Sequence, residues 1–175
     1  SGNCIVMHIP FSIINFTPDS FSDGGRYFSI ESVVNRLKFL KSIGVNHFDF
    51  GCQSTAPLNT DSGIESELER INIIFSNKTI LSLLEGSTVS IDTFRWECIE
   101  HACSLLNSIN LNKIIWNDVS GVVDEYVNSW LGQSENNYYV LCHNLCGSRF
   151  NVCSHMDYKD DGLIVLGVPS NSFNQ

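Results

Sequence analysis

The sequence predicts an α/β fold: a TIM-type (β/α)8 barrel that is incomplete, with about five to six βα units. Apolar runs of strand length alternate with amphipathic segments along the chain, which is typical of parallel βα units. Polar clusters follow the apolar runs at steps of about 25 to 40 residues, the size of one such unit. The chain has 175 residues, whereas a complete barrel needs about 250. We therefore expect residues 1–175 to form a single, partial barrel domain, with an atypical C-terminal segment at 156–175.

The first half of the chain predicts two strands and two helices. Ser29 is a plausible N-cap for a helix that carries Glu31 in its first turn and ends at Gly44, because serine caps helix starts and glycine follows helix ends. A second helix of the surface type is expected over Gly63–Phe75, with Glu65, Glu67, Glu69 and Arg70 around an apolar stripe. The strands expected here are Ile5–Ile14 and Val45–Gly51.

The second half repeats the pattern. Its expected strands are Val89–Ile91, Lys113–Trp116 and Tyr138–Cys142, with a sixth strand near the C-terminus after Gly162. The helices between them bury Ile99, Ala102 and Leu106 in one case and cover Val122–Leu131 in the other. Because helices separate the strands, the strands must run parallel and present their following loops on one rim.

Charge and composition exclude several classes of function. The formal charge is −9, and no cluster of lysine or arginine is present, which argues against binding to nucleic acid or to an anionic membrane. No apolar run approaches the ~18 residues of a membrane span. The seven cysteines are odd in number and have no repeated spacing, so we expect free thiols in a reducing, cytoplasmic compartment.

Four polar residues are predicted at the carboxyl ends of successive strands: Asn15, Asp49, Asp92 and Asn117. In a parallel barrel these ends converge on one mouth. Their carboxylates and amides can pair with a planar heterocycle that carries amino and amide groups, such as a pterin. For Asp92 and Asn117 the alternative is a helix N-cap, which asparagine and aspartate also favour.

The motifs around these residues resemble those of dihydropteroate synthases. Residues 15–25, Asn-Phe-Thr-Pro-Asp-Ser-Phe-Ser-Asp-Gly-Gly, match every fixed position of that family's first signature. Three further segments are similar to the family's later ones, in the same order and spacing: 49–57, 90–93 and 116–121. Four independent matches make the combination highly specific.

The resemblance implies a transferase of folate biosynthesis with a barrel fold. Such an enzyme joins p-aminobenzoate to 6-hydroxymethyl-7,8-dihydropterin pyrophosphate and releases pyrophosphate with the help of Mg²⁺. It implies that Asn15, which would also bind the metal, acts with Asp92 and Asn117 as the catalytic set. The implied substrate-binding residues are Asp19, Ser20, Arg26, Asp49, Thr55, Pro57 and Val119. The expected partners are these small molecules, and either a homodimer or a complementing chain.

The chain departs from the family pattern at two kinds of position. Cys52 and Ala56 stand where the family has glycine and arginine, so one cationic anchor is missing and Arg26 is the candidate to replace it. The family's later segments, which supply an aspartate, a lysine, an arginine and a histidine, have no counterpart in the chain. Two alternatives therefore remain open: a pterin-binding module without catalysis, and a structural subunit.

Overall fold

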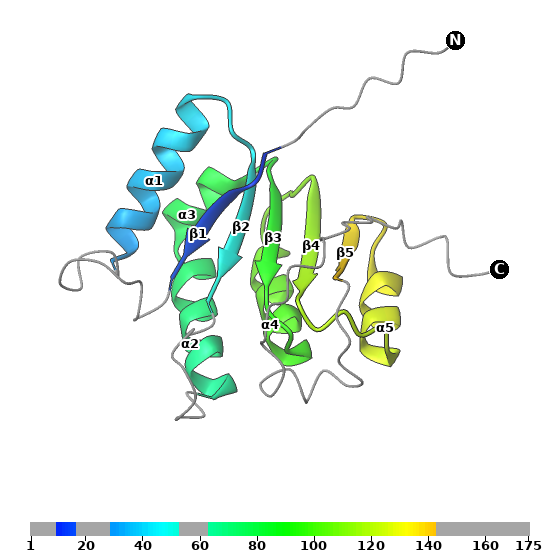
Figure 1. The fold of residues 1–175 in the computed structure, drawn as a ribbon. Coiled ribbons are helices and arrows are strands. Elements are labelled where there is room, and N and C mark those ends of the chain that lie inside the picture. Colours follow the sequence, from blue (N-terminus) through cyan, green and yellow to red (C-terminus); the bar gives the residue numbers. More distant parts are fainter. Residues whose placement is uncertain (1–9, 17–28, 53–62, 143–175) are drawn as a thin grey trace, which may run out of the picture.

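Five parallel strands form one sheet in the computed structural model, which describes residues 10–16, 29–52 and 63–142 (Figure 1). The strands follow the chain order, and each pairs in parallel with the next. They are β1 (Ser12–Asn15), β2 (His47–Gly51), β3 (Thr88–Asp92), β4 (Lys113–Asp118) and β5 (Asn137–Leu141). This confirms the predicted α/β class and the parallel arrangement.

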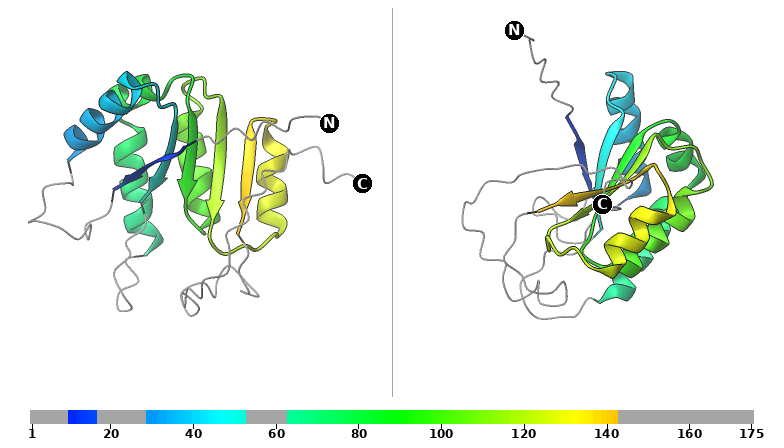
Figure 2. Two further views of the ribbon diagram at one scale, coloured as in Figure 1. Left: turned by 45° about the horizontal axis from the view of Figure 1, so that its top comes forward. Right: turned by 90° about the vertical axis from the view of Figure 1, so that its right-hand side faces the viewer.

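The helices are α1 (Ile30–Ser42), α2 (Ile64–Phe75), α3 (Lys78–Leu84), α4 (Trp96–Leu106) and α5 (Glu125–Gln133). They cover one face of the sheet, as the edge-on view of Figure 2 shows. The alternation of strand side chains agrees with this arrangement. Phe48, Phe50, Val89, Ile91 and Trp116 point to the helices and are almost fully buried.

Several helix boundaries confirm the predictions from local sequence. The side chain of Ser29 accepts a hydrogen bond from the backbone N–H of Ser32 at 3.1 Å, and Gly44 follows α1 with a φ of 87°. Such a positive φ is accessible to glycine at little cost. In α4, Ile99, Ala102 and Leu106 are fully buried, as expected.

The structure corrects three predictions about the helices. The crossover from β2 to β3 holds a second helix, α3, which begins at an Asn77 cap that the sequence reading did not use. Helix α5 begins at Glu125 rather than Val122, because Asp124 caps it. Helix α2 was expected to be a surface helix, but two of its charged residues, Glu67 and Arg70, are buried.

Two of the expected strands lie wholly or partly outside the described residues. The first strand was expected over Ile5–Ile14, and its described part begins at Ser12; the expected sixth strand falls within 143–175. Among the described helices, none is both long and apolar enough to cross a membrane.

Candidate functional site

The carboxyl ends of four strands place polar residues in a single row. Asn15 pairs in register with Gly51, Gly51 with Asp92, and Asp92 with Asn117. Residues paired across neighbouring strands point to the same face of a sheet. Asn15, Asp92 and Asn117 therefore face the same side, the face opposite the helices, as the sequence predicts for a common mouth. We call Asn15, Gly51, Asp92 and Asn117 the rim row.

Asp49 lies deeper in the sheet than predicted, two residues before the end of β2. It is the middle residue of β2 rather than its end, and it pairs in register with Ser90 of β3. It remains on the face of the rim row, because it lies two residues before Gly51. The Nδ2 atom of Asn117 is 3.4 Å from its Oδ1 atom. The prediction that these residues converge is confirmed, but Asp49 forms the floor of the site rather than its edge.

Neither Asp92 nor Asn117 is a helix cap. The residue before α4 is Arg95, which makes no side-chain capping bond, and the cap of α5 is Asp124. The alternative interpretation of both residues as N-caps is therefore wrong. Their side chains remain at the rim, available for contact with a ligand.

Gly51 provides the space that the Asn15 side chain occupies. A Cβ atom built at Gly51 would lie 2.8 Å from the Oδ1 atom of Asn15, closer than such contacts occur. The amide of Asn15 therefore lies across the position of Gly51, in the direction of β3. No local pattern indicates this contact, since it depends on the register of β1 against β2.

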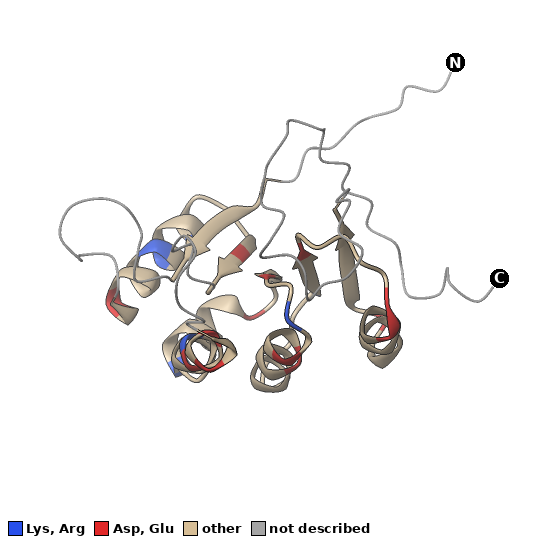
Figure 3. Cartoon of the chain, turned by 60° about the horizontal axis from the view of Figure 1, so that its bottom comes forward, with Lys and Arg blue, Asp and Glu red and all other residues tan. Residues whose placement is uncertain are grey.

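Asp92 is the carboxylate of the rim row, and other acidic residues lie near it. The pKa of Asp92 is raised to about 7, first by burial and then by the nearby charges of Asp49, Glu67 and Asp118. The first cause is desolvation, which disfavours the charged form of a carboxyl group. Figure 3, a view toward this end of the sheet, shows acidic positions at the ends of the central strands. Asp92 can thus act as a hydrogen-bond donor or acceptor near neutral pH.

A buried ionic network lies around α2. Glu67 of α2 forms an ion pair with Arg95 at the start of α4. Arg70 donates hydrogen bonds to the carbonyl of Cys52 and the hydroxyl of Ser66. The network links the residue after β2 to the segment after β3. The sequence interpretation missed it, because two of the partners, Arg95 and Cys52, lie 28 and 18 positions away from α2 residues Glu67 and Arg70.

A second hydrogen-bonded group holds the loop after β4. Asp118 and Ser120 are fully buried, and the Asp118 carboxylate accepts bonds from the Ser120 N–H at 2.8 Å and the Tyr139 hydroxyl at 3.0 Å. Aspartate followed two residues later by serine is typical of an Asx turn. Tyr139 carried no such signal, because only strand pairing brings it beside β4.

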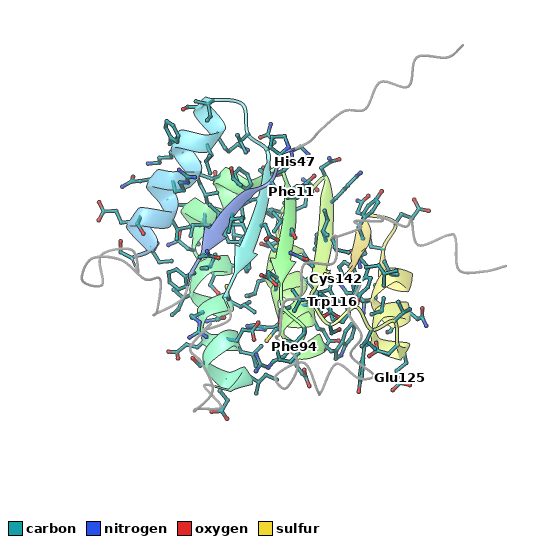
Figure 4. The ribbon with its side chains drawn as sticks, viewed as in Figure 1. Phe11, His47, Phe94, Trp116, Glu125 and Cys142 are labelled. Carbon is teal, nitrogen blue, oxygen red and sulfur yellow. The ribbon has the colours of Figure 1, made fainter. Side chains whose placement is uncertain are left out.

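Aromatic packing supports the rim from the helix side. Trp116 is fully buried, contacts the rings of Trp96, Trp130 and Tyr139, and donates its Nε1–H to the carbonyl of Thr93 at 2.7 Å. In Figure 4, Trp116 and Cys142 lie toward the carboxyl ends of the strands, whereas Phe11 and His47 lie toward their start. Trp116 therefore fixes the residue that follows Asp92.

The other predicted site residues divide into two groups. Val119 follows β4 directly and is partly exposed at the rim. Asp19, Ser20, Arg26, Thr55 and Pro57 lie outside the described residues, within 17–28 and 53–62. Within the described ranges, no group of three or more histidine, cysteine, aspartate or glutamate residues could hold a metal ion.

A parallel sheet with helices on one face and a polar rim at the carboxyl ends of its strands defines the class: an α/β barrel with its site at the mouth. The model of the family described as "pterin binding enzyme" matches residues 11–157. The chain belongs to this family.

Curated relatives are similar in sequence to this chain. A dihydropteroate synthase of Staphylococcus haemolyticus is 34% identical over 137 residues, 78% of this chain and 48% of that protein. A folate synthesis bifunctional protein of Arabidopsis thaliana is 33% identical over 130 residues, 74% of this chain and 26% of that protein. The chain thus spans about a quarter to a half of the length of these relatives.

Solved structures agree. The dihydropteroate synthase of Anaplasma phagocytophilum with bound 6-hydroxymethylpterin-monophosphate superposes with a TM-score of 0.57 at 26% identity, covering 81% of this chain and 52% of that one. The Xanthomonas albilineans enzyme with 4-aminobenzoic acid gives a TM-score of 0.54 at 29% identity, covering 76% and 46%. These neighbours are TIM barrels, and the five strands correspond to about half of one.

Proposed function

We propose that the chain forms the pterin and diphosphate side of a dihydropteroate synthase. The reaction joins p-aminobenzoate to 6-hydroxymethyl-7,8-dihydropterin pyrophosphate in folate biosynthesis. The observation that carries the proposal is the register pair of Asp92 and Asn117, with Asp49 within 3.4 Å of Asn117. Family membership and the names of the relatives support it.

Three side chains offer the groups that a pterin needs. A pterin is flat, with amino and ring N–H donors along one edge and a carbonyl nearby. Asp92 and Asp49 supply carboxylate acceptors, and Asn117 supplies both a donor and an acceptor. Because the pKa of Asp92 is raised to about 7 by burial, this residue can also hold a proton against a ring nitrogen. Val119 would pack against the ring.

Asn15 is the proposed contact for the diphosphate and for Mg²⁺. The amide oxygen of Asn15 is a hard ligand, and Asn15 is exposed at the edge of the rim. Mg²⁺ usually takes few protein ligands and completes its shell with water and substrate phosphates, so a single amide oxygen fits this role. When bound, the ion would neutralise the charge that grows on the departing diphosphate.

The chemistry requires no nucleophile from the protein. The bond between the pterin methylene carbon and the diphosphate oxygen breaks, and the arylamine nitrogen forms the new bond and then loses a proton. Positive charge develops on the pterin as the diphosphate leaves, and the carboxylates of Asp92 and Asp49 would stabilise it. We propose that Asp19, Ser20, Arg26, Thr55 and Pro57, all outside the described residues, supply the remaining substrate contacts.

A pterin-binding module without catalysis is the second candidate. The observation in its favour is that Ala56 stands where the family has arginine, so that one cationic anchor for the substrates is missing. Turnover and binding separate the two functions. An enzyme releases pyrophosphate from the pterin substrate in the presence of p-aminobenzoate and Mg²⁺, whereas a binding module takes up the pterin and releases none.

Calorimetry and a pyrophosphate assay on the 175-residue chain test the proposal. We expect 6-hydroxymethylpterin to bind, and Asp92→Ala and Asn117→Ala each to weaken binding by about tenfold or more. Glu69→Ala, on the exposed side of α2, is the matched control. A chain that folds and does not bind the pterin would refute the proposed function in both its forms.

The edges of the sheet support a proposal about assembly. Within the described sheet, β1 and β5 each pair with one strand only, and Ile13 of β1 is 63% exposed. Open edges favour association with another strand. We propose that a second copy or a complementing chain covers them, which the mass in solution would reveal.

We also propose a reducing, cytoplasmic compartment for the protein. The four described cysteines are free, which supports this proposal.

A further inference from the structure

The loop between β4 and α5 is adjacent to the rim row, because it begins directly after Asn117 and Asp118. Backbone hydrogen bonds to side chains determine its shape. The N–H of Ser120 donates to the Asp118 carboxylate at 2.8 Å, and the N–H of Val122 donates to the Ser120 hydroxyl at 3.2 Å. Gly121 has a φ of 66°, which fits a tight turn. The loop conformation therefore depends on where the Asp118 carboxylate is held.

Asp118 points away from the rim row. It is one residue beyond Asn117 in β4 and therefore lies on the helix face, where it is fully buried. Its second carboxylate oxygen accepts a hydrogen bond from the Tyr139 hydroxyl of β5 at 3.0 Å. The same hydroxyl lies 3.0 Å from the carbonyl oxygen of Val122. One side chain thus contacts the loop at its beginning and near its end.

The ring of Tyr139 is itself fixed. It is buried and meets the ring of Trp116 edge-on, with centroids 5.5 Å apart and planes at 84°. Trp116 in turn donates to the carbonyl of Thr93, next to Asp92. A hydroxyl on a ring held in this way has little freedom to move. Its bonds restrain the loop more than those of a flexible side chain would.

We propose that Tyr139 is a positioning residue for the ligand site. Its hydroxyl fixes Asp118 and Val122, and this fixes the orientation of Asn117 and of Val119 at the rim. Tyr139 lies on the helix face and cannot touch the ligand itself. The identity of the ligand as a pterin rests on the proposed function, whereas the restraint of the loop does not.

A purely structural role makes a different prediction. If the hydroxyl only satisfies buried acceptors, its loss lowers the free energy of unfolding and leaves the folded loop and its ligand affinity unchanged. If Tyr139 positions the loop, its loss changes the loop in the folded protein. Tyr139→Phe removes only the hydroxyl, and Tyr138→Phe, on the neighbouring residue of β5, is the matched control.

Hydrogen exchange and calorimetry on the 175-residue chain distinguish these roles. In Tyr139→Phe we expect the amides of Ser120, Gly121 and Val122 to exchange about 3- to 10-fold faster, while the amides of Ile91 and Trp116 keep their rates. We expect the Kd for 6-hydroxymethylpterin to rise by a similar factor. The control should match the wild type in both measurements.

The outcomes test the positioning role of Tyr139 and the proposed function separately. Unchanged exchange at the three loop amides, or faster exchange with an unchanged Kd, overturns the positioning role. A general rise in exchange that includes Ile91 and Trp116 also overturns it, since the hydroxyl then serves overall stability. A wild-type chain that fails to bind the pterin refutes the proposed function, and the exchange rates still show whether Tyr139 holds the loop.

Discussion

The Nδ2 atom of Asn117 lies 3.4 Å from the Oδ1 atom of Asp49, although β3 separates their two strands. On the strand between them, Ser90 pairs with Asp49 and Asp92 pairs with Asn117. A sheet must curve toward its polar face for side chains two strands apart to meet, and such curvature is that of a barrel wall. This contact therefore connects the fold to the site.

Replacing the donor of this contact should destabilise the rim. Asn117→Asp keeps the shape of the side chain and places a third carboxylate beside Asp49 and Asp92. We expect the free energy of unfolding to fall by about 1–3 kcal/mol at pH 8, because like charges repel, and by less at pH 5, where Asp92 is protonated. Urea unfolding at the two pH values measures this. Equal losses at both would contradict the electrostatic explanation.

The raised pKa of Asp92 predicts how stability depends on pH. Its folded pKa is about 7, against 3.8 for an unperturbed aspartate, so the folded protein binds more protons than the unfolded chain between these values. Stability therefore falls as the pH rises from about 4 to 7 and is then constant. Asp92→Asn should remove up to about 4 kcal/mol of this decline. If the stability of Asp92→Asn declined with pH as much as that of the wild type, Asp92 would not be the cause of the decline.

Gly51→Ala tests the position of Asn15. The added Cβ would lie 2.8 Å from the Asn15 amide oxygen, and this flexible side chain can move away at low cost. We expect the stability to change by less than about 1 kcal/mol, and binding of pyrophosphate with Mg²⁺ to weaken as much as in Asn15→Ala. The double variant should bind no worse than either single one. Additive losses would mean that Gly51 acts independently of Asn15.

The ionic network of α2 should contribute strongly to stability. Glu67→Ala leaves Arg95 without its carboxylate partner, and breaking a buried pair costs about 3–5 kcal/mol. Arg95 is partly exposed, so we expect about 2–3 kcal/mol in urea unfolding. Glu65→Ala, on the exposed side of the same helix, should change stability by less than about 0.5 kcal/mol. Similar losses in the two variants would place Glu67 at the surface after all.

Local sequence determined the alternation of strands and helices, the cap at Ser29 and the residues of the rim row. These features depend on the period of apolar residues and on capping groups within a few positions of one another. The same local signals were not recognised at α3, which Asn77 caps, and the start of α5 was misplaced although Asp124 caps it.

The tertiary structure decided which polar side chains meet and which are buried. Asp49 reaches Asn117 across 68 positions of the chain, and Tyr139 reaches Asp118 across 21. Glu67 and Arg70 are buried because α4 and the end of β2 cover one side of α2. Such contacts depend on strand register and helix packing, which form only when distant segments come together. For this reason the sequence could predict which polar residues lie at this end of the sheet, and only the fold could determine how they are held.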